Sequence, residues 1–382
     1  MRRKILIFVD WFEPGFKAGG PIQSCRNLVE SLGDDFDFYL VTGDRDFGDE
    51  EPYSGISFNT WIDYKGKAKV YYVEGNKPSV ALVKKLVNEI KPAVVYLNNM
   101  YSVGFSQIPL LAMYIIKPLP KIVLAPRGML QEGAVKQKYL KKIVFLTLLR
   151  YSGIPKKIVF QATDQQEAAD VRKFFPNAKD VMLVGNIPDL KLTIRNKEQK
   201  QKGELKAVFL SRIQAKKNLH FILELLLECS DPGENISLDI YGRPENEGYW
   251  ADCVKLMNQA PSNVKITIKG PVNHDKVLET LSGYHLFILP TLAENFGHAI
   301  FEALKVGTPI LISNNTPWLN IESRGGGWDI PLHNKEKYLE AIKTMVNMDN
   351  EQFRKMSDNA AKIADDYLKK NDFTADYIKL FS

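Results

Sequence analysis

Short apolar runs rich in β-branched residues alternate along the chain with amphipathic helical stretches, and the alternation begins near the N-terminus. Helical patterns such as Ile22–Ser31 and Pro78–Ile90 separate the apolar runs. A strand followed by a helix, repeated several times, predicts a parallel sheet covered on both faces. The runs that predict strands in the first half are Ile5–Val9, Phe38–Thr42, Val70–Val73, Val94–Leu97, Ile122–Ala125, Ile158–Gln161 and Val181–Leu183.

A second alternating series follows a polar interruption. Residues 190–204 are rich in lysine and show no apolar periodicity, which predicts a solvated linker. We therefore expect two doubly wound α/β domains, residues 1–187 and 188–365, with a helix at about 366–382 packing back on the first. Ligands of such sheets bind at the carboxyl ends of strands, and a cleft between two facing domains is the default site. The later strand candidates are Ala207–Leu210, Ser237–Tyr241, Val264–Lys269, Leu286–Leu289 and Ile310–Ser313.

Composition agrees with an ordinary globular protein. The 382 residues suffice for two or three domains, and 45% apolar with 25% charged residues excludes a mainly disordered chain. A net charge of +6 is mild over this length, so nucleic acid is not an expected partner. The apolar runs 108–116 and 143–149 are far shorter than a membrane span, and the run 5–9 is too short for a signal peptide.

The cysteines and two pairs of aspartates indicate whether the chain holds a metal ion and in which cellular compartment it folds. Cys25, Cys229 and Cys253 are widely separated, which argues against a disulfide framework or a zinc site and favours a reducing cytoplasm. The segments 35–37 and 44–46 formally match DxD, a motif that holds a metal ion in some enzymes. We interpret their aspartates as solvated loop acids and predict no metal site and no cofactor.

The most informative stretch runs from Leu289 to Pro309. A predicted strand ends near Pro290, a loop carries Glu294 to Gly297, and a helix begins near His298. The unsatisfied N–H groups at a helix start favour an anion such as a diphosphate, and glycine allows close approach to the backbone. Glu302 lies about 12 Å further along the helix, wider than the roughly 5–10 Å that separates paired glycosidase carboxylates. The two glutamates are therefore expected to hold two parts of one long ligand, or simply to face solvent on a capped helix.

This stretch resembles the family 4 glycosyltransferases (glycosyl transferases group 1), which retain anomeric configuration and have the GT-B fold. Their hallmark is a Glu, seven residues and a second Glu, followed by an apolar helix, Gly and Pro. Glu294, Glu302, Gly307 and Pro309 match this pattern. The resemblance implies that Glu294 hydrogen-bonds the transferred sugar while Glu302 holds the nucleotide ribose. It also implies that backbone amides of the loop and helix start hold the diphosphate, at Asn295, Phe296, Gly297 and His298.

Three further segments match the same family. The segment 209–219 looks like a strand end followed by a basic loop, and the resemblance implies that Arg212 and Lys217 neutralise the diphosphate and stabilise the leaving group. Gly242, within Tyr-Gly-Arg-Pro, resembles the glycine turn that frames the nucleotide. Pro271 follows Lys-Gly at a strand end that resembles the one contacting the base. The last two matches are less specific, because glycine turns after strands are common.

The N-terminal half carries two weaker matches. Gly19 and Gly20 open a predicted helix and resemble the paired-glycine loop of the family near the phosphate, although a plain tight turn has the same pattern. Arg127 lies in Ala-Pro-Arg-Gly-Met, where many members carry a histidine, and the first 219 residues contain no histidine. Arginine stays protonated, so Arg127 is expected to bind a phosphate or the sugar and not to act as a base.

Residues 136–150 combine five basic residues with a strongly apolar stretch. Such a helix suits either the edge of a core, with lysines facing water, or an anionic membrane surface. Many family members act on lipid-linked acceptors at the cytoplasmic leaflet, so the resemblance implies a possible peripheral contact with the inner membrane.

Together these features predict a two-domain GT-B enzyme that moves a hexose-type sugar from a nucleotide-diphosphate sugar to a hydroxyl of a glycan or lipid-linked acceptor in bacterial surface polysaccharide assembly. One alternative is a nucleotide-sugar epimerase of the same fold, which would need acid and base groups in the N-terminal half. The other is a nucleotide-sugar-binding protein without turnover, which is expected to lack Glu294 or Lys217; both are present.

Overall fold

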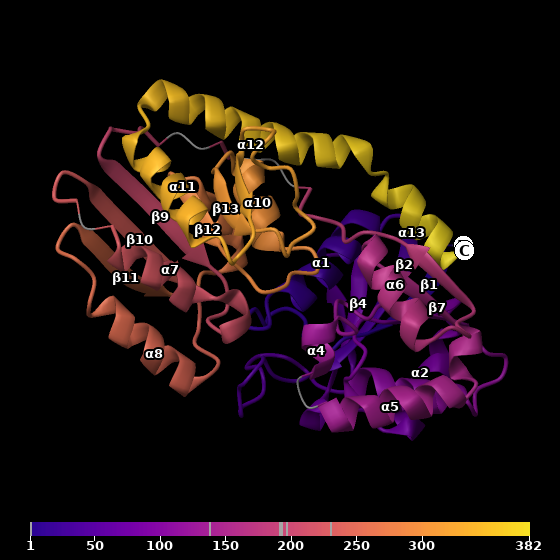
Figure 1. The fold of residues 1–382 in the computed structure, drawn as a ribbon. Coiled ribbons are helices and arrows are strands. Elements are labelled where there is room, and N and C mark those ends of the chain that lie inside the picture. The colour runs from indigo at the N-terminus through magenta and orange to yellow at the C-terminus, as the bar shows by residue number, and fades with distance from the viewer. Residues whose placement is uncertain (1, 137–138, 191–193, 196–197, 230) are drawn as a thin grey trace. The chain divides into compact units, whose positions relative to one another are not determined.

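The computed structural model describes residues 2–136, 139–190, 194–195, 198–229 and 231–382 (Figure 1). Contacts divide the chain into two compact units. Unit 1 comprises Met1–Leu190 and Asp372–Ser382, and unit 2 comprises Lys191–Asn371. Each unit is built on a sheet of its own, as the two alternating series predict.

Unit 1 contains an eight-stranded sheet in the order β3-β4-β2-β1-β5-β6-β7-β8, in which only the β3–β4 pair is antiparallel. One apolar cluster joins a face of this sheet to α2, α3, α5 and α6. The main elements of unit 1 are β1 (Arg3–Phe8), α1 (Gly20–Leu32), β2 (Phe36–Gly43), β3 (Trp61–Tyr64), β4 (Ala68–Val73), α2 (Val80–Ile90), β5 (Val94–Leu97), α3 (Ile108–Met113), β6 (Lys121–Leu124), α4 (Glu132–Lys136), α5 (Tyr139–Tyr151), β7 (Ile158–Ala162), α6 (Gln165–Phe174), β8 (Asp180–Leu183) and α13 (Phe373–Phe381).

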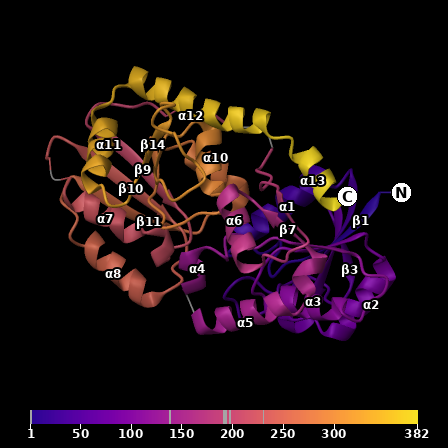
Figure 2. The same ribbon diagram turned by 45° about the vertical axis from the view of Figure 1, so that its right-hand side comes forward.

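Unit 2 contains a six-stranded sheet, all parallel, in the order β11-β10-β9-β12-β13-β14. α7 contacts α8 and α11, whereas α10 contacts α9 and α12, so two groups of helices accompany the sheet (Figure 2). The main elements of unit 2 are β9 (Glu204–Leu210), α7 (Leu219–Leu227), β10 (Asn235–Tyr241), α8 (Glu247–Met257), β11 (Val264–Gly270), α9 (Val277–Leu281), β12 (Leu286–Leu289), α10 (His298–Val306), β13 (Ile310–Ser313), β14 (Gly327–Ile330), α11 (Lys335–Asn347) and α12 (Asn350–Lys370).

The polar segment before unit 2 is more than a solvated linker. Lys200 is buried, and its ammonium group donates to the carbonyl oxygens of Val346 at 3.0 Å and Met348 at 3.2 Å, near the end of α11. Carbonyl groups at a helix C-terminus attract cations, which explains why a lysine is buried here. Burial lowers the pKa of Lys200 to about 8. The expectation of a fully solvated segment 190–204 is therefore wrong at this residue.

The C-terminal region forms two helices where a single helix at about 366–382 was expected. α12 ends at Lys370, and α13 begins at Phe373 after Asp372, whose side chain caps the new helix by accepting from the N–H of Ala375 at 3.0 Å. Aspartate is a strong N-cap, so the chain restarts a helix here instead of continuing one. α12 belongs to unit 2 and α13 to unit 1 (Figure 1).

α13 is held in unit 1 by aromatic packing and by one polar network. The ring of Phe381 lies 5.4 Å from that of Phe36 and 5.7 Å from that of Tyr96. Gln161 on β7 donates to the hydroxyl of Tyr377 at 3.0 Å and accepts from that of Tyr96 at 2.7 Å. The last residues of the chain are thus part of the core of unit 1.

All three cysteines are buried and unpaired with one another. Burial raises the pKa of the Cys25 thiol to about 12 and that of Cys229 to about 11, and it also raises the pKa of Cys253. The thiols therefore stay protonated near neutral pH. Among the residues that the structure describes, none of the helices has the length and apolar content needed to span a membrane.

The packing of α13 generates a stability prediction. Phe381→Ala removes a fully buried ring and should lower the free energy of unfolding of unit 1 by about 3–5 kcal/mol, measured by chemical denaturation. Ile378→Ala, on the exposed side of the same helix, is the control and should cost far less. Equal effects of the two substitutions would contradict the assignment of Phe381 to the core.

Candidate functional site

The order of strands reverses direction between β9 and β12 in unit 2, because β10 and β11 lie on one side of β9 and β12 to β14 on the other. Ligands of open parallel sheets bind beside such a switch point, at the carboxyl ends of the strands. The loop after β9 carries Arg212 and Lys217, and the loop after β12 carries Glu294 to Gly297. The structure therefore brings these predicted residues to neighbouring strand ends.

Three hydrogen bonds to backbone carbonyl groups connect the two loops. The carbonyl oxygen of Lys216 accepts from the N–H of Leu292 at 2.8 Å and from the hydroxyl of Thr291 at 3.0 Å. The side-chain amide of Asn218 donates to the carbonyl of Pro290 at 3.0 Å. These bonds fix the relative position of the loops before any charged side chain is considered.

Lys217 and Glu294 form an ion pair and hydrogen bond across the two loops. Only 12% of the Lys217 side chain and 15% of the Glu294 side chain are exposed, so water screens the pair weakly. Burial lowers the pKa of the neighbouring Lys216, while Glu294 acts in the opposite direction. Lys216 is thus part of this charged group.

Arg212 lies at the same end of the sheet but has a different partner. Its guanidinium group donates to Glu245 at 2.7 Å, in the segment between β10 and α8. Gly242 lies just before that segment and has a positive φ. A Cβ atom at Gly242 would lie 2.0 Å from the carbonyl oxygen of Ser211. Glycine is therefore required where the ends of β9 and β10 meet. The N–H of Gly242 donates to the carbonyl of Gly270, which directly precedes the exposed Pro271.

The start of α10 presents backbone N–H groups without a capping side chain. Gly297 is the N-cap residue with φ 78°, and no side chain accepts a hydrogen bond there. A Cβ at Gly297 would lie 2.9 Å from Ile300 Cδ1 and 3.0 Å from Glu294 Cγ, so glycine keeps the side chain of Glu294 in place. Helix starts of this kind favour anions, and Asn295 lies in the loop directly before it.

Phe296 and His298 flank that glycine and belong to an aromatic cluster. Their rings lie 4.8 Å apart, and the Phe296 ring lies 5.5 Å from that of Trp318. The indole N–H of Trp318 donates to the carbonyl of Phe296 at 2.6 Å. The side chain of Phe296 therefore packs in the core of unit 2, which leaves its backbone as the part suited to the predicted ligand contact.

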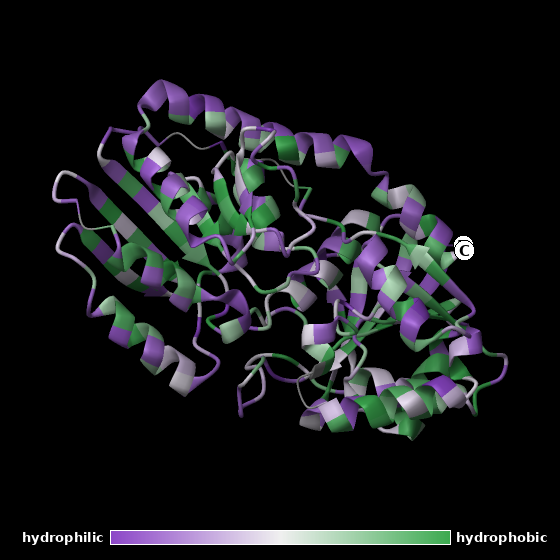
Figure 3. Ribbon diagram, in the orientation of Figure 1, coloured by the Kyte–Doolittle hydropathy of each residue, from purple (hydrophilic) through white to green (hydrophobic). Residues whose placement is uncertain are grey.

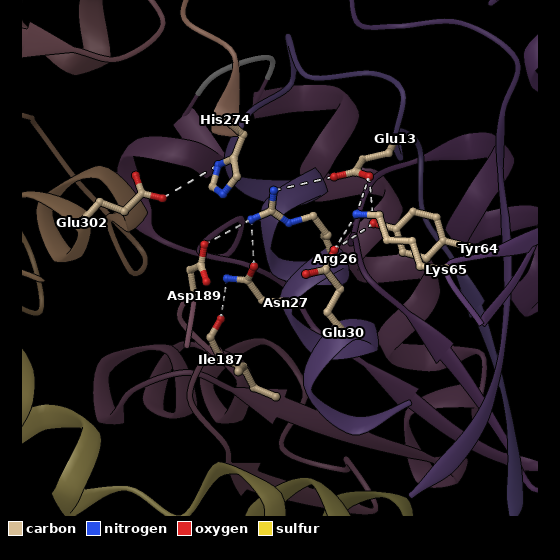
Figure 4. Close-up of polar contacts among 10 residues, drawn as sticks. All are labelled: Glu13, Arg26, Asn27, Glu30, Tyr64, Lys65, Ile187, Asp189, His274 and Glu302. Atoms are coloured by element: carbon tan, nitrogen blue, oxygen red, sulfur yellow. Dashed lines mark hydrogen bonds and ion pairs between the residues drawn. The ribbon is translucent and has the colours of Figure 1, made fainter. Parts of the chain in front are cut away.

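Glu302 is nearly buried on α10 and faces a histidine. Its carboxylate lies 3.9 Å from Nδ1 of His274, which follows β11, and only 4% of the glutamate side chain is exposed (Figure 4). Glu294 is paired with Lys217 instead. The two glutamates therefore have separate polar surroundings within unit 2, as expected if each holds a different part of a ligand.

In unit 1 the predicted paired glycines begin α1. Gly19 is the N-cap with φ 67°, Gly20 is the first helical residue, and no side chain caps this helix. The preceding loop is braced by the buried carboxylate of Asp46, which accepts from the N–H of Phe16 at 2.8 Å and of Lys17 at 3.0 Å.

The aspartates of segment 44–46 are therefore not solvated, contrary to expectation. Asp44 is also buried, where it pairs with Arg45 and accepts from the N–H of Gly75 at 2.8 Å. Backbone donors from distant segments explain this burial, since they satisfy the carboxylates. Among the described residues no three His, Cys, Asp or Glu side chains gather into a group that could hold a metal ion.

Arg127 lies in a different setting from the one that its motif suggested. Its guanidinium group donates to Asn98 at 2.6 Å, to the hydroxyl of Tyr96 at 2.6 Å and to Asn186. The buried Glu167 accepts from the N–H of Gly128 and stabilises the same turn. These contacts give Arg127 a structural role in unit 1, and its predicted binding of a phosphate or sugar stays a prediction.

A second buried arginine of unit 1 escaped the sequence argument. Arg26 on α1 lies 3.6 Å from the carboxylate of Glu13 and 3.8 Å from that of Asp189, and it donates to Asn27 at 3.2 Å (Figure 4). Asn27 in turn donates to the carbonyl of Ile187. Arg26 thereby links Glu13, in the loop after β1, to Asp189, near the point where the chain leaves unit 1.

Asp10 follows shortly after the end of β1, at the switch point of the sheet in unit 1, where β1 lies between β2 and β5. Its carboxylate accepts from the side chains of Asn99, at 2.8 Å, and Ser102. Burial raises the pKa of Asp10, against the opposing effect of these hydrogen bonds. Its position directly after a strand was the one signal in the sequence that could have singled it out.

Known proteins are similar to unit 2 in sequence. Residues 191–363 match the model of the family described as glycosyl transferases group 1. Residues 191–363 are therefore similar to that family, in a match that covers somewhat less than half of the chain. This match confirms the predicted resemblance to glycosyl transferases group 1 for the part of the chain that it covers. A curated relative, alpha-D-kanosaminyltransferase of Streptomyces kanamyceticus, is 25% identical over 162 residues, which cover 41% of this chain and 40% of that protein.

Solved structures extend the similarity to nearly the whole chain. HepE of Anabaena, in complex with UDP and glucose, covers 99% of this chain and 98% of its own at a TM-score of 0.66 and 15% identity. WaaG, a glycosyltransferase involved in lipopolysaccharide biosynthesis, covers 99% of this chain and 98% of its own at a TM-score of 0.68 and 15% identity. At such identities the likeness shows the fold, and the predicted GT-B class is confirmed.

Proposed function

We propose that the protein is a retaining glycosyltransferase that moves a sugar from a nucleotide-diphosphate sugar to a hydroxyl group of an acceptor. The observation that carries this proposal is the Lys217–Glu294 pair, which lies beside the uncapped start of α10 at the switch point of unit 2. The relatives support the same chemistry, because one transfers a kanosaminyl group and another structure holds UDP with glucose.

In this proposal the positive groups of unit 2 act on the diphosphate. The N–H groups at the start of α10 and the ammonium of Lys217 bind phosphate oxygens, and Arg212 adds a second cation from the same loop. Negative charge grows on the diphosphate as the sugar leaves. Cations fixed beforehand in a weakly solvated place stabilise that charge without reorganising.

The glutamates divide the rest of the donor between them. We assign Glu302 to the nucleotide ribose and Glu294 to the hydroxyls of the transferred sugar, with Lys217 keeping the Glu294 carboxylate ionised and oriented. Gly242 and Pro271 lie at the ends of β10 and β11 and are assigned to the nucleotide side. Because the helix start and two cations supply positive charge, we propose that transfer needs no divalent metal and no cofactor.

The acceptor side is assigned to unit 1. We propose a glycan or a lipid-linked acceptor, a role in bacterial surface polysaccharide assembly, and peripheral contact of segment 136–150 with an anionic cytoplasmic membrane surface. The similarity to WaaG supports this assignment, because WaaG is involved in lipopolysaccharide biosynthesis. An epimerase is less well supported, because it would need acid and base groups in the N-terminal half. The first 219 residues contain no histidine, and Arg26 and Arg127 are held in networks of hydrogen bonds and ion pairs.

Lys217→Ala tests the assignment of positive charge. The substitution should lower kcat/KM by an amount equivalent to about 2–4 kcal/mol of transition-state stabilisation and should also weaken binding of a nucleoside diphosphate. Kinetics with a panel of nucleotide sugars, followed by mass spectrometry of products, provides the measurement. Lys265→Ala, on the exposed side of β11, is the matched control. Unchanged kinetics in Lys217→Ala would remove this lysine from the site.

The two glutamates should respond differently to loss of charge. Glu302→Gln should weaken binding of the free nucleoside diphosphate, because it removes the assigned ribose ligand. Glu294→Gln should leave that affinity nearly intact and depress kcat, because its assigned partner is the sugar. Calorimetry with the diphosphate and steady-state kinetics measure the two effects. Equal losses of affinity in both variants would defeat the division of roles.

Chelation tests the assigned independence from metal. Transfer activity should be unchanged after incubation with excess ethylenediaminetetraacetate, since the protein supplies the charge that a metal would provide. Complete loss of activity that manganese restores would reverse the assignment.

A further inference from the structure

Both cations that the proposed function assigns to the diphosphate are paired with a glutamate in the structure. Lys217 pairs with Glu294, and the guanidinium group of Arg212 donates to the carboxylate of Glu245 at 2.7 Å. A carboxylate that stays on such a cation repels an arriving phosphate, and the repulsion is strong where water screens weakly. The two ion pairs differ in how easily they open.

The Lys217–Glu294 pair is held firmly in unit 2. Only 12% of the lysine side chain and 15% of the glutamate side chain are exposed. The N–H of Glu294 donates to the carbonyl of Asn315 at 3.1 Å, and its loop leads into α10, which is buried and mostly hydrophobic along its length (Figure 3). Separating two charges in such a place is costly, so we expect this pair to stay closed when a ligand binds.

The Arg212–Glu245 pair lies closer to water. The exposed fraction is 35% for the arginine side chain and 21% for the glutamate side chain. Residues 245–248 are exposed as they lead into α8, a helix in which Cys253 is the buried residue. Exposed ion pairs contribute little to stability, so this pair opens at small cost. Of the two carboxylates, that of Glu245 is therefore the one suited to give way to a phosphate.

The backbone of Glu245 is fastened to the loop that carries Arg212. The N–H of Ile213 donates to the carbonyl of Arg243 at 2.9 Å, and the N–H of Glu245 donates to the carbonyl of Ile213 at 3.0 Å. Rotation of its own side chain is therefore enough to move the carboxylate off the guanidinium group and back again. A tethered group of this kind has a high effective concentration at its partner.

We propose that Glu245 is a positioning residue that acts through Arg212. Its carboxylate holds the guanidinium group before a ligand binds, gives way to the diphosphate and competes with it for the same cation. This proposal rests on the proposed function, because the diphosphate is the ligand assigned to Arg212.

A tethered competitor weakens the binding of every anion that needs Arg212. Inorganic phosphate lacks the other contacts of the donor and is disfavoured most in practice, whereas the donor is also held by the start of α10 and on its nucleotide side. The same competition favours release of the nucleoside diphosphate after transfer. That product is the more anionic ligand, because its terminal phosphate ionises a second time near neutral pH.

Glu245→Gln removes the competing charge and keeps the shape of the side chain. Calorimetry of the wild type with UDP, GDP and ADP identifies the nucleoside diphosphate to use, and the variant should bind it about three- to tenfold more tightly. Glu224→Gln is the matched control, because it makes the same change in charge and breaks an ion pair to Lys335 at 2.8 Å; its affinity should be unchanged. An affinity that falls or stays the same in Glu245→Gln would overturn the proposal.

Arg212→Ala shows whether the gain in affinity depends on the arginine. In a chain that carries Arg212→Ala, adding Glu245→Gln should change the affinity for the nucleoside diphosphate less than about twofold, because no cation remains to compete for. A gain as large as the one measured with Arg212 in place would indicate simple repulsion between Glu245 and the phosphate. That result would overturn the proposed competition.

Inorganic phosphate tests Glu245 without the nucleotide assignment. Phosphate should raise the Tm of Glu245→Gln at about three- to tenfold lower concentrations than it raises the Tm of the wild type. Failure of all three nucleoside diphosphates to bind the wild type would contradict the proposed function, and the phosphate titration would still decide on Glu245. Equal responses of the wild type and Glu245→Gln to phosphate would overturn the role of Glu245.

Discussion

A lysine ammonium and a glutamate carboxylate, both largely withdrawn from water, connect the loops after β9 and β12. Either charge alone would be costly in this position, so the pair constrains both loops at once. The backbone N–H of Leu292 and the hydroxyl of Thr291 both donate to the carbonyl oxygen of Lys216 and hold the same loops together. The uncapped start of α10 follows directly after, so its orientation depends on the same connection. A small shift of either loop would separate the charges and redirect the helix start.

Local pattern was sufficient for most of the fold. The alternation of apolar runs and helical stretches predicted two parallel sheets, because strand and helix periodicities are properties of neighbouring residues. β3 and β14 were not predicted: β3 (Trp61–Tyr64) is a short antiparallel edge strand, and β14 (Gly327–Ile330) begins with a glycine. The burial of Lys200 depends on carbonyl groups about 150 residues away, and no local pattern indicates such partners.

The sequence predicted only part of the candidate site. Glu294, Lys217 and Gly297 were recognised because their motif has fixed spacing, and the structure places them at adjacent strand ends. The burial of Asp46 and the hydrogen-bond partners of Arg127 were not predicted, because their surroundings are assembled from separate strands and loops. Asp46 has its backbone donors in the loop before α1, and Arg127 has its acceptors on β5, after β5 and after β8. Residue type and motif alone do not show which tertiary hydrogen bonds a side chain will form.

The protonated state of the three buried cysteines makes this protein convenient for site-directed spectroscopy. Alkylation proceeds through the thiolate, which is scarce when burial raises the pKa, and the sulfur atoms are also shielded from reagents. A cysteine introduced at an exposed position should therefore react far ahead of Cys25, Cys229 and Cys253. Fluorophores or spin labels attached in unit 1 and unit 2 would then report interdomain distances in solution, without removing any native sulfur from the core.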